Sequence, residues 1–154
     1  MLKTLYGASP ADIDNMNTAR LRDEFMVEEL FTAGEIRFAY THVDRMIVGG
    51  AVPTSGVLSF GNGAEVGTEA FFDAREMGIA NLGGPGAITV DGERHELDNR
   101  DILYVGRGAK TVTLESADAG KPARFYMNSV PAGADIPHRL IKRAESKPLV
   151  MGDE

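Results

Sequence analysis

The sequence predicts an all-β domain, either a barrel or a sandwich, with roughly nine to eleven short strands and little helix. Glycine accounts for 18 of the 154 residues, well above the usual ~7%, and the excess lies in contexts typical of tight turns. Between these turns, short apolar or alternating runs recur along the chain. The length suits a single domain.

The stretch from residue 83 to 110 carries the clearest strand pattern and indicates two successive β-hairpins. Asp91 and Gly92 supply the positive-φ pair that a two-residue type I′ turn requires. The expected order is a strand at 87–90, this turn, a strand at 93–97, a polar turn at 98–101 and a buried strand at 102–105. Such a run is typical of a small antiparallel barrel.

The N-terminal residues predict a short helix. Ser9 has the character of an N-cap, Pro10 suits the first helical position, and Asp12 is placed to bond back to the cap. Residues 18–24 predict a second helical turn. We therefore assign residues 1–24 to an N-terminal helical segment.

Residues 25–130 are expected to form the barrel. Residues 36–42 alternate strictly, with Ile36, Phe38 and Tyr40 on one face, as in a half-buried strand. Residues 25–31 are compatible with a preceding strand, and 32–35 with the hairpin loop between the two. The other expected features are a strand at 46–48 that Gly49 and Gly50 end, a flexible loop at 61–67, and strands at 57–60, 69–75, 78–82, 110–115 and 123–130.

Residues 131–154 are expected to form an extended arm or linker over the surface. This part contains three of the seven prolines, together with mixed charge and little periodicity. Such composition favours an extended chain over a packed element.

Composition excludes several functional classes. The net charge of −7 and the pI near 5.0 argue against nucleic-acid binding, which requires a basic surface. No stretch approaches the roughly 20 apolar residues of a membrane span, and the first residues lack the features of a signal peptide. Without cysteine, the chain has no disulfides and no thiolate sites. A cytoplasmic protein without a membrane partner is the simplest expectation.

The densest polar cluster beside a strand contains Tyr40, His42, Asp44 and Arg45. If the strand continues, Tyr40, His42 and Asp44 share one face, and this row could orient the imidazole for acid–base chemistry. The alternative interpretation is a structural polar network at the rim of the barrel.

Two basic residues next to glycines form a second candidate site. Arg107 and Lys110 could hold a carboxylate at the mouth of the barrel, although solvated surface charges would give the same pattern. The histidines His42, His95 and His138 are too widely spaced to form a local metal motif. We expect His95 to face solvent and neither His95 nor His138 to take part in chemistry.

The residues 86–93 and 101–106 resemble the double-stranded β-helix barrel of cupins, an RmlC-like jelly roll. Glu76 precedes Gly83 at the spacing of the metal-binding glutamate of cupins. The positions of the cupin histidines, however, hold other residues: Ala70 and Phe72, or Glu69 and Phe71, and later Lys110 or Thr111. The resemblance therefore implies a cupin-like barrel that keeps only Glu76 of the metal ligands.

Six segments resemble, in order, the family of 5-dehydro-4-deoxy-D-glucuronate isomerase (4-deoxy-L-threo-5-hexosulose-uronate ketol-isomerase): residues 21–28, 40–50, 75–78, 86–92, 100–110 and 122–126. The resemblance implies an isomerase of pectin and uronate breakdown. Its reaction would interconvert 5-dehydro-4-deoxy-D-glucuronate and 3-deoxy-D-glycero-2,5-hexodiulosonate.

Members of this family resemble two barrels in tandem, and their zinc site belongs to the second. The resemblance thus implies that this chain is an N-terminal, metal-free half, inactive alone, which pairs with a second barrel and assembles into a homo-oligomer. Zinc, a Lewis acid, would be bound by the other half. The candidates for contact with the sugar acid are His42, Asp44 and Arg45, then Tyr40, Arg107 and Lys110. The alternative is a stand-alone, non-catalytic cupin that binds sugars or acts as a scaffold.

Overall fold

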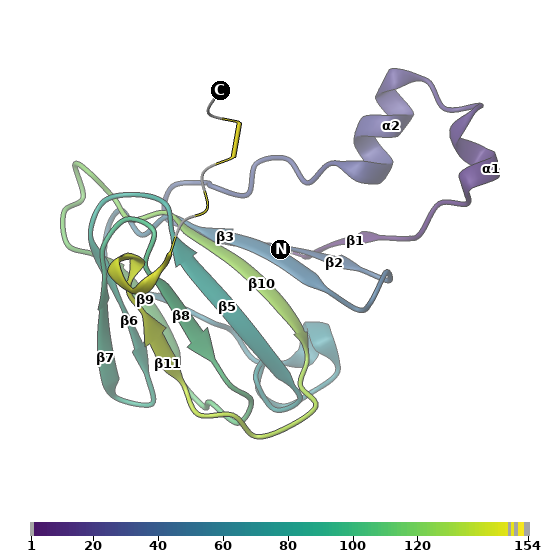
Figure 1. Cartoon of the computed structure of the whole chain (residues 1–154). Helices are drawn as coiled ribbons and strands as arrows, with labels where there is room; N and C mark the ends of the chain where they lie inside the picture. Colours follow the sequence, from purple (N-terminus) through teal and green to yellow (C-terminus); the bar gives the residue numbers. More distant parts are fainter. Residues whose placement is uncertain (1, 148, 150, 153–154) are drawn as a thin grey trace.

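The computed structural model describes residues 2–147, 149 and 151–152, which form two β-sheets that pack face to face (Figure 1). The larger sheet contains, from edge to edge, β1 (Leu2–Leu5), β2 (Ile36–Thr41), β3 (Ile47–Ala51), β10 (Phe125–Pro131), β5 (Arg75–Asn81), β8 (Ile102–Val105) and β11 (Arg139–Ile141). The smaller sheet contains β4 (Leu58–Ser59), β9 (Val112–Ser116), β6 (Gly86–Val90) and β7 (Glu93–Leu97). Among the strands of the described residues, β1 and β2 pair in parallel, and the other neighbours pair antiparallel.

The chain crosses repeatedly between the sheets, from β3 to β4, from β4 to β5 and from β5 to β6. This alternation winds both sheets around one core, which is the arrangement of a jelly roll. The predicted all-β, cupin-like barrel with a short N-terminal helix is therefore confirmed. No helix in the described part of the chain is long and apolar enough to span a membrane.

The core lies between the sheets, where the strands turn alternate residues inward. In β5, Met77 and Ile79 are buried, whereas Glu76 lies on the outer face and is half-buried. Full burial of one such side chain contributes roughly 1.5–3 kcal/mol. One part of the core is an aromatic cluster with ring centroids 5.1–5.7 Å apart, formed by Phe38, Phe60, Phe71 and Phe72.

The two predicted N-terminal helices are confirmed, but the assignment of all of residues 1–24 to a helical segment is wrong, because Leu2–Leu5 form β1 and pair with β2. Helix α1 (Pro10–Ile13) is capped by Ser9, whose Oγ accepts from the Ala11 N–H at 3.3 Å, and α2 (Thr18–Phe25) by Asn17, whose Oδ1 accepts from the Arg20 N–H at 2.9 Å. Neither helix contains a buried residue, and both project away from the barrel (Figure 1).

The predicted β6–β7 hairpin is confirmed, with Asp91 at φ 48° and Gly92 at φ 91°. The second predicted hairpin is wrong, because β7 and β8 belong to different sheets and β8 pairs with β5 and β11. The connecting turn contains Arg100 at φ 73° and is closed by the Asp98 N–H, which donates to Asp101 Oδ2 at 2.9 Å. The turn therefore carries the chain across the core.

The predicted strand at residues 25–31 is wrong. Phe25 is the last residue of α2, and residues 26–32 form no regular element. The segment crosses the outer face of the larger sheet, where the Leu30 carbonyl oxygen would lie 2.4 Å from a Cβ placed on Gly50. The turn at 32–35 is present, but it joins this irregular segment, not a strand, to β2.

The prediction that Gly49 and Gly50 end a strand is also wrong, since both lie within β3. A Cβ on Gly49 would lie 2.5 Å from the Phe38 ring, and one on Gly50 would meet Leu30. Gly49 thus allows the Phe38 ring to approach the inner face of the sheet, and Gly50 allows Leu30 to approach the outer face.

Two further strand predictions need correction. Residues 69–74 form turns, with the Ala70 N–H donating to Asp73 Oδ2 at 2.8 Å, and the predicted strands at 69–75 and 78–82 are replaced by the single strand β5. The loop at 61–67 contains a short 3₁₀ helix, η1 (Ala64–Val66).

The prediction that residues 131–154 form only an extended arm over the surface needs correction. It adds β11 to the edge of the larger sheet, where Leu140 pairs with Leu103 and packs against the core. A 3₁₀ helix, η2 (Arg143–Glu145), follows.

Candidate functional site

The site residues predicted from the sequence gather at one end of the barrel. The Arg75 guanidinium at the start of β5 donates to the Arg45 carbonyl of the β2–β3 turn at 2.6 Å. The Gly108 N–H of the β8–β9 loop donates to the Phe72 carbonyl at 2.8 Å, and the Ala132 N–H after β10 donates to the Ala74 carbonyl at 2.9 Å. Four loops therefore meet around the start of β5.

The β2–β3 turn brings Tyr40, His42 and Arg45 to this end, but not in the predicted row. Strand β2 stops at Thr41, and Asp44 and Arg45 have φ of 54° and 52° at the centre of a tight turn. Asp44 therefore does not share a strand face with Tyr40 and His42. The positive φ of two consecutive residues is typical of a type I′ hairpin turn.

His42 is held by aromatic rings. Its imidazole stacks on Tyr6, with ring centroids 4.6 Å apart, and meets Tyr40 edge-on at 5.2 Å. Within the described residues no hydrogen bond to the imidazole is found, and the side chain is exposed. An acid–base role would require an orienting partner, and Asp44 does not supply one.

Arg107 and Lys110 both contact carboxylates of the chain itself. Arg107 pairs with Asp135, and Lys110 Nζ lies 3.0 Å from Asp73 Oδ1. The Arg107 hydrogen bond lowers the pKa of Asp135. Hydrogen bonds from the Ala70 N–H and from Lys110 lower the pKa of Asp73. Arg107 and Lys110 are therefore paired with carboxylates of the chain itself, and not with the carboxylate of a ligand.

Asp91 joins the β6–β7 turn to the β8–β9 loop. Its Oδ1 accepts from the Lys110 N–H at 2.9 Å and from the Thr111 N–H at 2.7 Å. Burial raises the pKa of Asp91, but these hydrogen bonds outweigh it and the pKa lies below its ordinary value. The carboxylate stabilises the loop that carries Arg107 and Lys110.

Glu76 lies on the outer face of the larger sheet, so the strand does not direct it toward a metal inside the barrel. Its Oε2 accepts from the Tyr104 hydroxyl at 2.9 Å. Burial and the nearby Glu76 raise the pKa of Tyr104. The neighbouring residue that faces the interior is Met77, which is 1% exposed.

The residues described do not fit a zinc ion. No group of three or more His, Asp or Glu side chains converges within residues 2–147, 149 and 151–152. Phe71 and Phe72, at the expected histidine positions, are buried in the aromatic cluster, and the Lys110 and Thr111 amides bond to Asp91.

The other two histidines have structural surroundings. The prediction that His95 faces solvent is wrong: its side chain is 11% exposed, and its buried Nε2 has no hydrogen-bond partner among the residues that the structure describes. His138 accepts from the Gly106 N–H through Nδ1 at 3.0 Å and so holds the arm against the end of β8.

Sequence reasoning missed Arg75 and Ser129. Arg75 is 6% exposed; its Nε donates to Ser129 Oγ at 3.1 Å, and its Nη2 donates to the Ser129 carbonyl at 3.0 Å. The strand register explains the contact between Arg75 and Ser129: Arg75 pairs with Pro131 in β10, and Arg75 and Ser129 both face inward. The signal is a charged residue at an inward position of a strand, but the expected strand at 69–75 begins six residues before β5, which hides this position.

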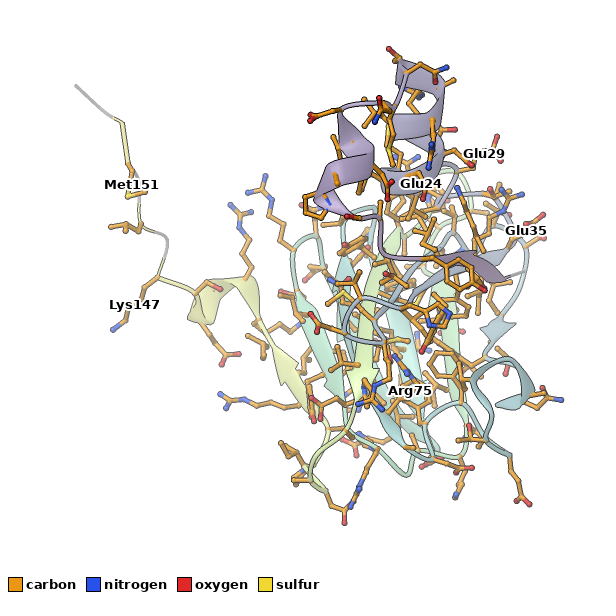
Figure 2. The ribbon with its side chains drawn as sticks, turned by 90° about the vertical axis from the view of Figure 1, so that its right-hand side faces the viewer. Glu24, Glu29, Glu35, Arg75, Lys147 and Met151 are labelled. Atoms are coloured by element: carbon orange, nitrogen blue, oxygen red, sulfur yellow. The ribbon has the colours of Figure 1, made fainter. Side chains whose placement is uncertain are left out.

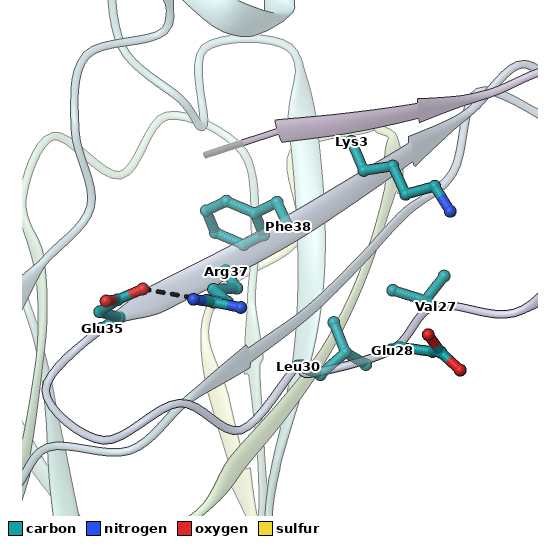
Figure 3. A pocket seen from close by; sticks show the side chains of 7 residues that line it. All are labelled: Lys3, Val27, Glu28, Leu30, Glu35, Arg37 and Phe38. Atoms are coloured by element: carbon teal, nitrogen blue, oxygen red, sulfur yellow. Dashed lines mark hydrogen bonds and ion pairs between the residues drawn. The ribbon is translucent and has the colours of Figure 1, made fainter. Parts of the chain in front are cut away.

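A groove beside β1 offers a different surface (Figure 3). It is lined by Lys3, Val27, Glu28, Leu30, Glu35, Arg37 and Phe38. Arg37 donates to Glu35 Oε2 and to Glu29 Oε2, both at 2.9 Å, and these bonds raise its pKa. Because its arginine is paired with acids of the chain, this groove is poorly suited to bind an anion.

Comparison with known proteins gives consistent relatives. The model of the KduI/IolB family matches residues 25–154. The 4-deoxy-L-threo-5-hexosulose-uronate ketol-isomerases of Yersinia enterocolitica and Yersinia pseudotuberculosis are each 45% identical over 141 residues, which cover 90% of this chain and 51% of theirs. The chain thus spans about half the length of these curated relatives.

Solved structures with a similar arrangement include cupin proteins. One from Bacteroides fragilis is 21% identical, with a TM-score of 0.41 over 71% of this chain and 74% of that one. A cupin 2 domain-containing protein from Halorhodospira halophila is 12% identical, with a TM-score of 0.43 over 77% of this chain and 73% of that one.

Proposed function

This chain belongs to the KduI/IolB family, and we propose that it forms the N-terminal half of a 4-deoxy-L-threo-5-hexosulose-uronate ketol-isomerase. The identity of 45% to enzymes of that name supports the proposal. The complete enzyme would interconvert 5-dehydro-4-deoxy-D-glucuronate and 3-deoxy-D-glycero-2,5-hexodiulosonate during pectin and uronate breakdown.

Within that enzyme, this barrel has a structural role and the other half binds zinc. The observation that carries this division is the packing of Phe71 and Phe72 where a metal-binding cupin needs histidines. The outward direction of Glu76 and its bond to Tyr104 also support it. The chain alone is then inactive.

We also propose that the barrel pairs with a second cupin barrel and that the enzyme is a cytoplasmic homo-oligomer. Several large apolar side chains support such contacts because they are exposed, among them Tyr6 (68%), Phe25 (54%) and Val43 (56%). Burial of such side chains against a partner removes apolar surface from water, which favours association.

The test compares the 154-residue chain with a two-barrel protein in which this chain replaces the matching half of the Yersinia enterocolitica enzyme. We expect isomerase turnover and one tightly bound zinc per chain only in the two-barrel protein. Circular dichroism of both samples establishes that they are folded. Turnover or stoichiometric zinc in the 154-residue chain would refute the division of roles, and a folded but inactive two-barrel protein would count against the assigned reaction.

A further inference from the structure

The two N-terminal helices lie in a loop with little packing of its own. Residues 6–26, here called the helical loop, contain α1 and α2, and Met16 is the single buried residue in this range. An exposed ion pair between Lys3 and Asp23 (3.4 Å) joins the loop to β1, and such pairs contribute little. The loop lies beside the barrel (Figure 1), and Lys147 and Met151 extend in another direction (Figure 2). Helices of four and eight residues are marginal in water unless another surface packs against them.

The exposed side chains of α1 combine apolar and acidic character. Ile13 is 41% exposed, and its neighbours in sequence, Asp12 and Asp14, are exposed acids. Neither carboxylate forms an ion pair or a side-chain hydrogen bond within the part of the chain that the structure describes. The surface that fits α1 should therefore be apolar at its centre and positive at its rim.

A hollow at the end of the barrel where β5 ends has this character. Its volume is about 680 Å³, and its apolar lining includes Phe31, Val52 and Leu82, which is 49% exposed. Lys121 and Arg124 also line it, and none of its described lining residues is acidic. Neither cation has an ion pair in the described chain, and the Arg124 guanidinium lies 5.4 Å from the centre of the Phe31 ring. The hollow is thus locally positive in a chain whose net charge is −7.

Hydrogen bonds fix the backbone around the hollow. The Gly84 N–H donates to the Pro122 carbonyl at 2.9 Å, and Asn99 Nδ2 donates to the Gly83 carbonyl at 3.1 Å. A Cβ on Gly84 would lie 2.0 Å from the Lys121 carbonyl oxygen, so the loops are in close contact. A surface that is already ordered binds a partner at a lower entropic cost.

The helical loop cannot place α1 in the hollow of its own chain. The loop begins at the far end of β2, where the Tyr6 ring stacks on His42 with centroids 4.6 Å apart. From Tyr6 to Ile13, three extended residues and one helical turn span roughly 16 Å. The six residues of β2 alone span roughly 20 Å, and the hollow begins beyond them, at Ala33.

The other end of the helical loop lies next to the hollow. Phe31 lines the hollow, and α2 ends at Phe25, six residues earlier. Two copies related by a twofold axis can therefore each place a helical loop on the hollow of the other. Such a reciprocal contact is closed and does not lead to a filament.

We propose that the hollow binds the helical loop of a second copy of this chain. Ile13 packs on the apolar centre of the hollow, and Asp12 and Asp14 pair with Lys121 and Arg124. The inference rests on the proposed homo-oligomer and deepens it, because it names the two surfaces in contact. It does not depend on the isomerase reaction.

The first test is sedimentation equilibrium of the 154-residue chain over a range of concentrations. We expect an equilibrium between a monomer of 16.5 kDa and a dimer of twice that mass. The dimer should weaken at high ionic strength, because salt screens exposed charges. Hydrogen exchange adds a second measurement: the amides of α2 should exchange more slowly as the dimer forms, whereas those of β5 should not change.

Variants of opposite charge test which surfaces are in contact. Asp12→Lys/Asp14→Lys makes the helical loop basic, and Lys121→Glu/Arg124→Glu makes the hollow acidic. Each variant alone then places like charges together, and we expect a dimer at least tenfold weaker than that of wild type. In a 1:1 mixture, both contacts of the mixed dimer have opposite charges, and the affinity should return to within about threefold of wild type.

Two further variants control for folding and for total charge. Ile13→Ala keeps every charge and should weaken the dimer at least tenfold, because each dimer contains two such contacts. Arg139→Glu/Lys147→Glu changes one exposed arginine and one exposed lysine outside the hollow, and its dimer should match that of wild type. Circular dichroism establishes that every variant is folded.

The outcomes separate this contact from the homo-oligomer on which it rests. A dimer that both charge variants leave intact, or a mixture no tighter than either variant alone, would overturn the contact and leave the homo-oligomer standing. A monomer at every concentration, or exchange in α2 that does not depend on concentration, would also overturn the contact. None of these results changes the expected isomerase turnover of the two-barrel protein.

Discussion

The Lys142 ammonium donates to Asp101 Oδ2 at 2.9 Å and thereby ties the C-terminal arm to the turn before β8. The Asp101 side chain is 4% exposed and also accepts from the Arg143 N–H at 2.8 Å and from the Asp98 N–H at 2.9 Å. Three donors compensate the burial of one carboxylate. The arm and the barrel are therefore joined by a polar contact as well as by β11.

The substitution Asp101→Asn should lower the free energy of unfolding by about 1–3 kcal/mol, because an amide cannot satisfy all three donors. Urea unfolding at pH 7, followed by circular dichroism, measures the change. Asp98→Asn in the same turn is the control, since the Asp98 side chain is exposed and its amide N–H is kept. We expect a change within about 0.5 kcal/mol there; equal losses in both variants would contradict the role of Asp101.

Acid should weaken the fold through the same carboxylate. Burial raises the pKa of Asp101, but the hydrogen bonds from Arg143 and Lys142 outweigh it, so the pKa is lowered in the folded state. A lowered pKa contributes stability above the unfolded value of about 3.9, and this contribution is lost as the pH falls through the folded value. The stability gap between wild type and Asp101→Asn should therefore narrow below about pH 4. A gap that stays constant between neutral and acidic pH would show that the carboxylate charge is not its source.

Gly106→Ala should detach the segment between β10 and β11. A Cβ at this position would lie 1.9 Å from the Ile136 carbonyl oxygen, so the backbone must move. We expect a loss of about 1–3 kcal/mol in urea unfolding and faster proteolysis around residue 136. Gly78→Ala is the matched control because nothing lies within 4 Å of its added Cβ. Similar stability of the two variants would contradict the close approach.

Asp91→Gly should destabilise the end of the barrel that carries Lys110 and Thr111. Glycine retains the positive φ of the turn but leaves the two amides without their acceptor. Thermal unfolding should show a lower Tm, which corresponds to about 1–3 kcal/mol. The control is Asp44→Gly, at φ 54° in the other tight turn, whose carboxylate forms no hydrogen bond within the described residues. If Asp44→Gly lowers the Tm as much as Asp91→Gly, the carboxylate contacts are not the cause.

Local chemistry allowed several elements to be predicted from the sequence. The Ser9–Pro10 start of α1 and the Asp91–Gly92 turn depend on backbone preferences of the residues themselves. Strict alternation likewise identified β2, with Ile36, Phe38 and Tyr40 against the core. These signals act over a few residues and need no knowledge of the rest of the fold.

The failures have a common cause, which is contact between distant parts of the chain. Gly49 and Gly50 have the pattern of a strand end, but they allow Phe38 and Leu30 to approach β3. Local sequence does not reveal the role of Arg75, because its partners are Ser129, 54 residues later, and the Arg45 carbonyl, 30 residues earlier. The predicted Tyr40–His42–Asp44 row does not form, because β2 ends at Thr41 and Asp44 lies in a tight turn.

The position of β10 at the centre of the larger sheet has a consequence for the order of folding. It separates β3 from β5 and pairs with both, so Phe125 meets Ala51 on one side and Asn81 on the other. Neither earlier strand has its central neighbour until residues 125–131 have been synthesised. Closure of such sequence-distant pairs is slow, typically milliseconds to seconds. On the ribosome, the nascent chain must therefore keep β3 and β5 from aggregating until residues 125–131 emerge.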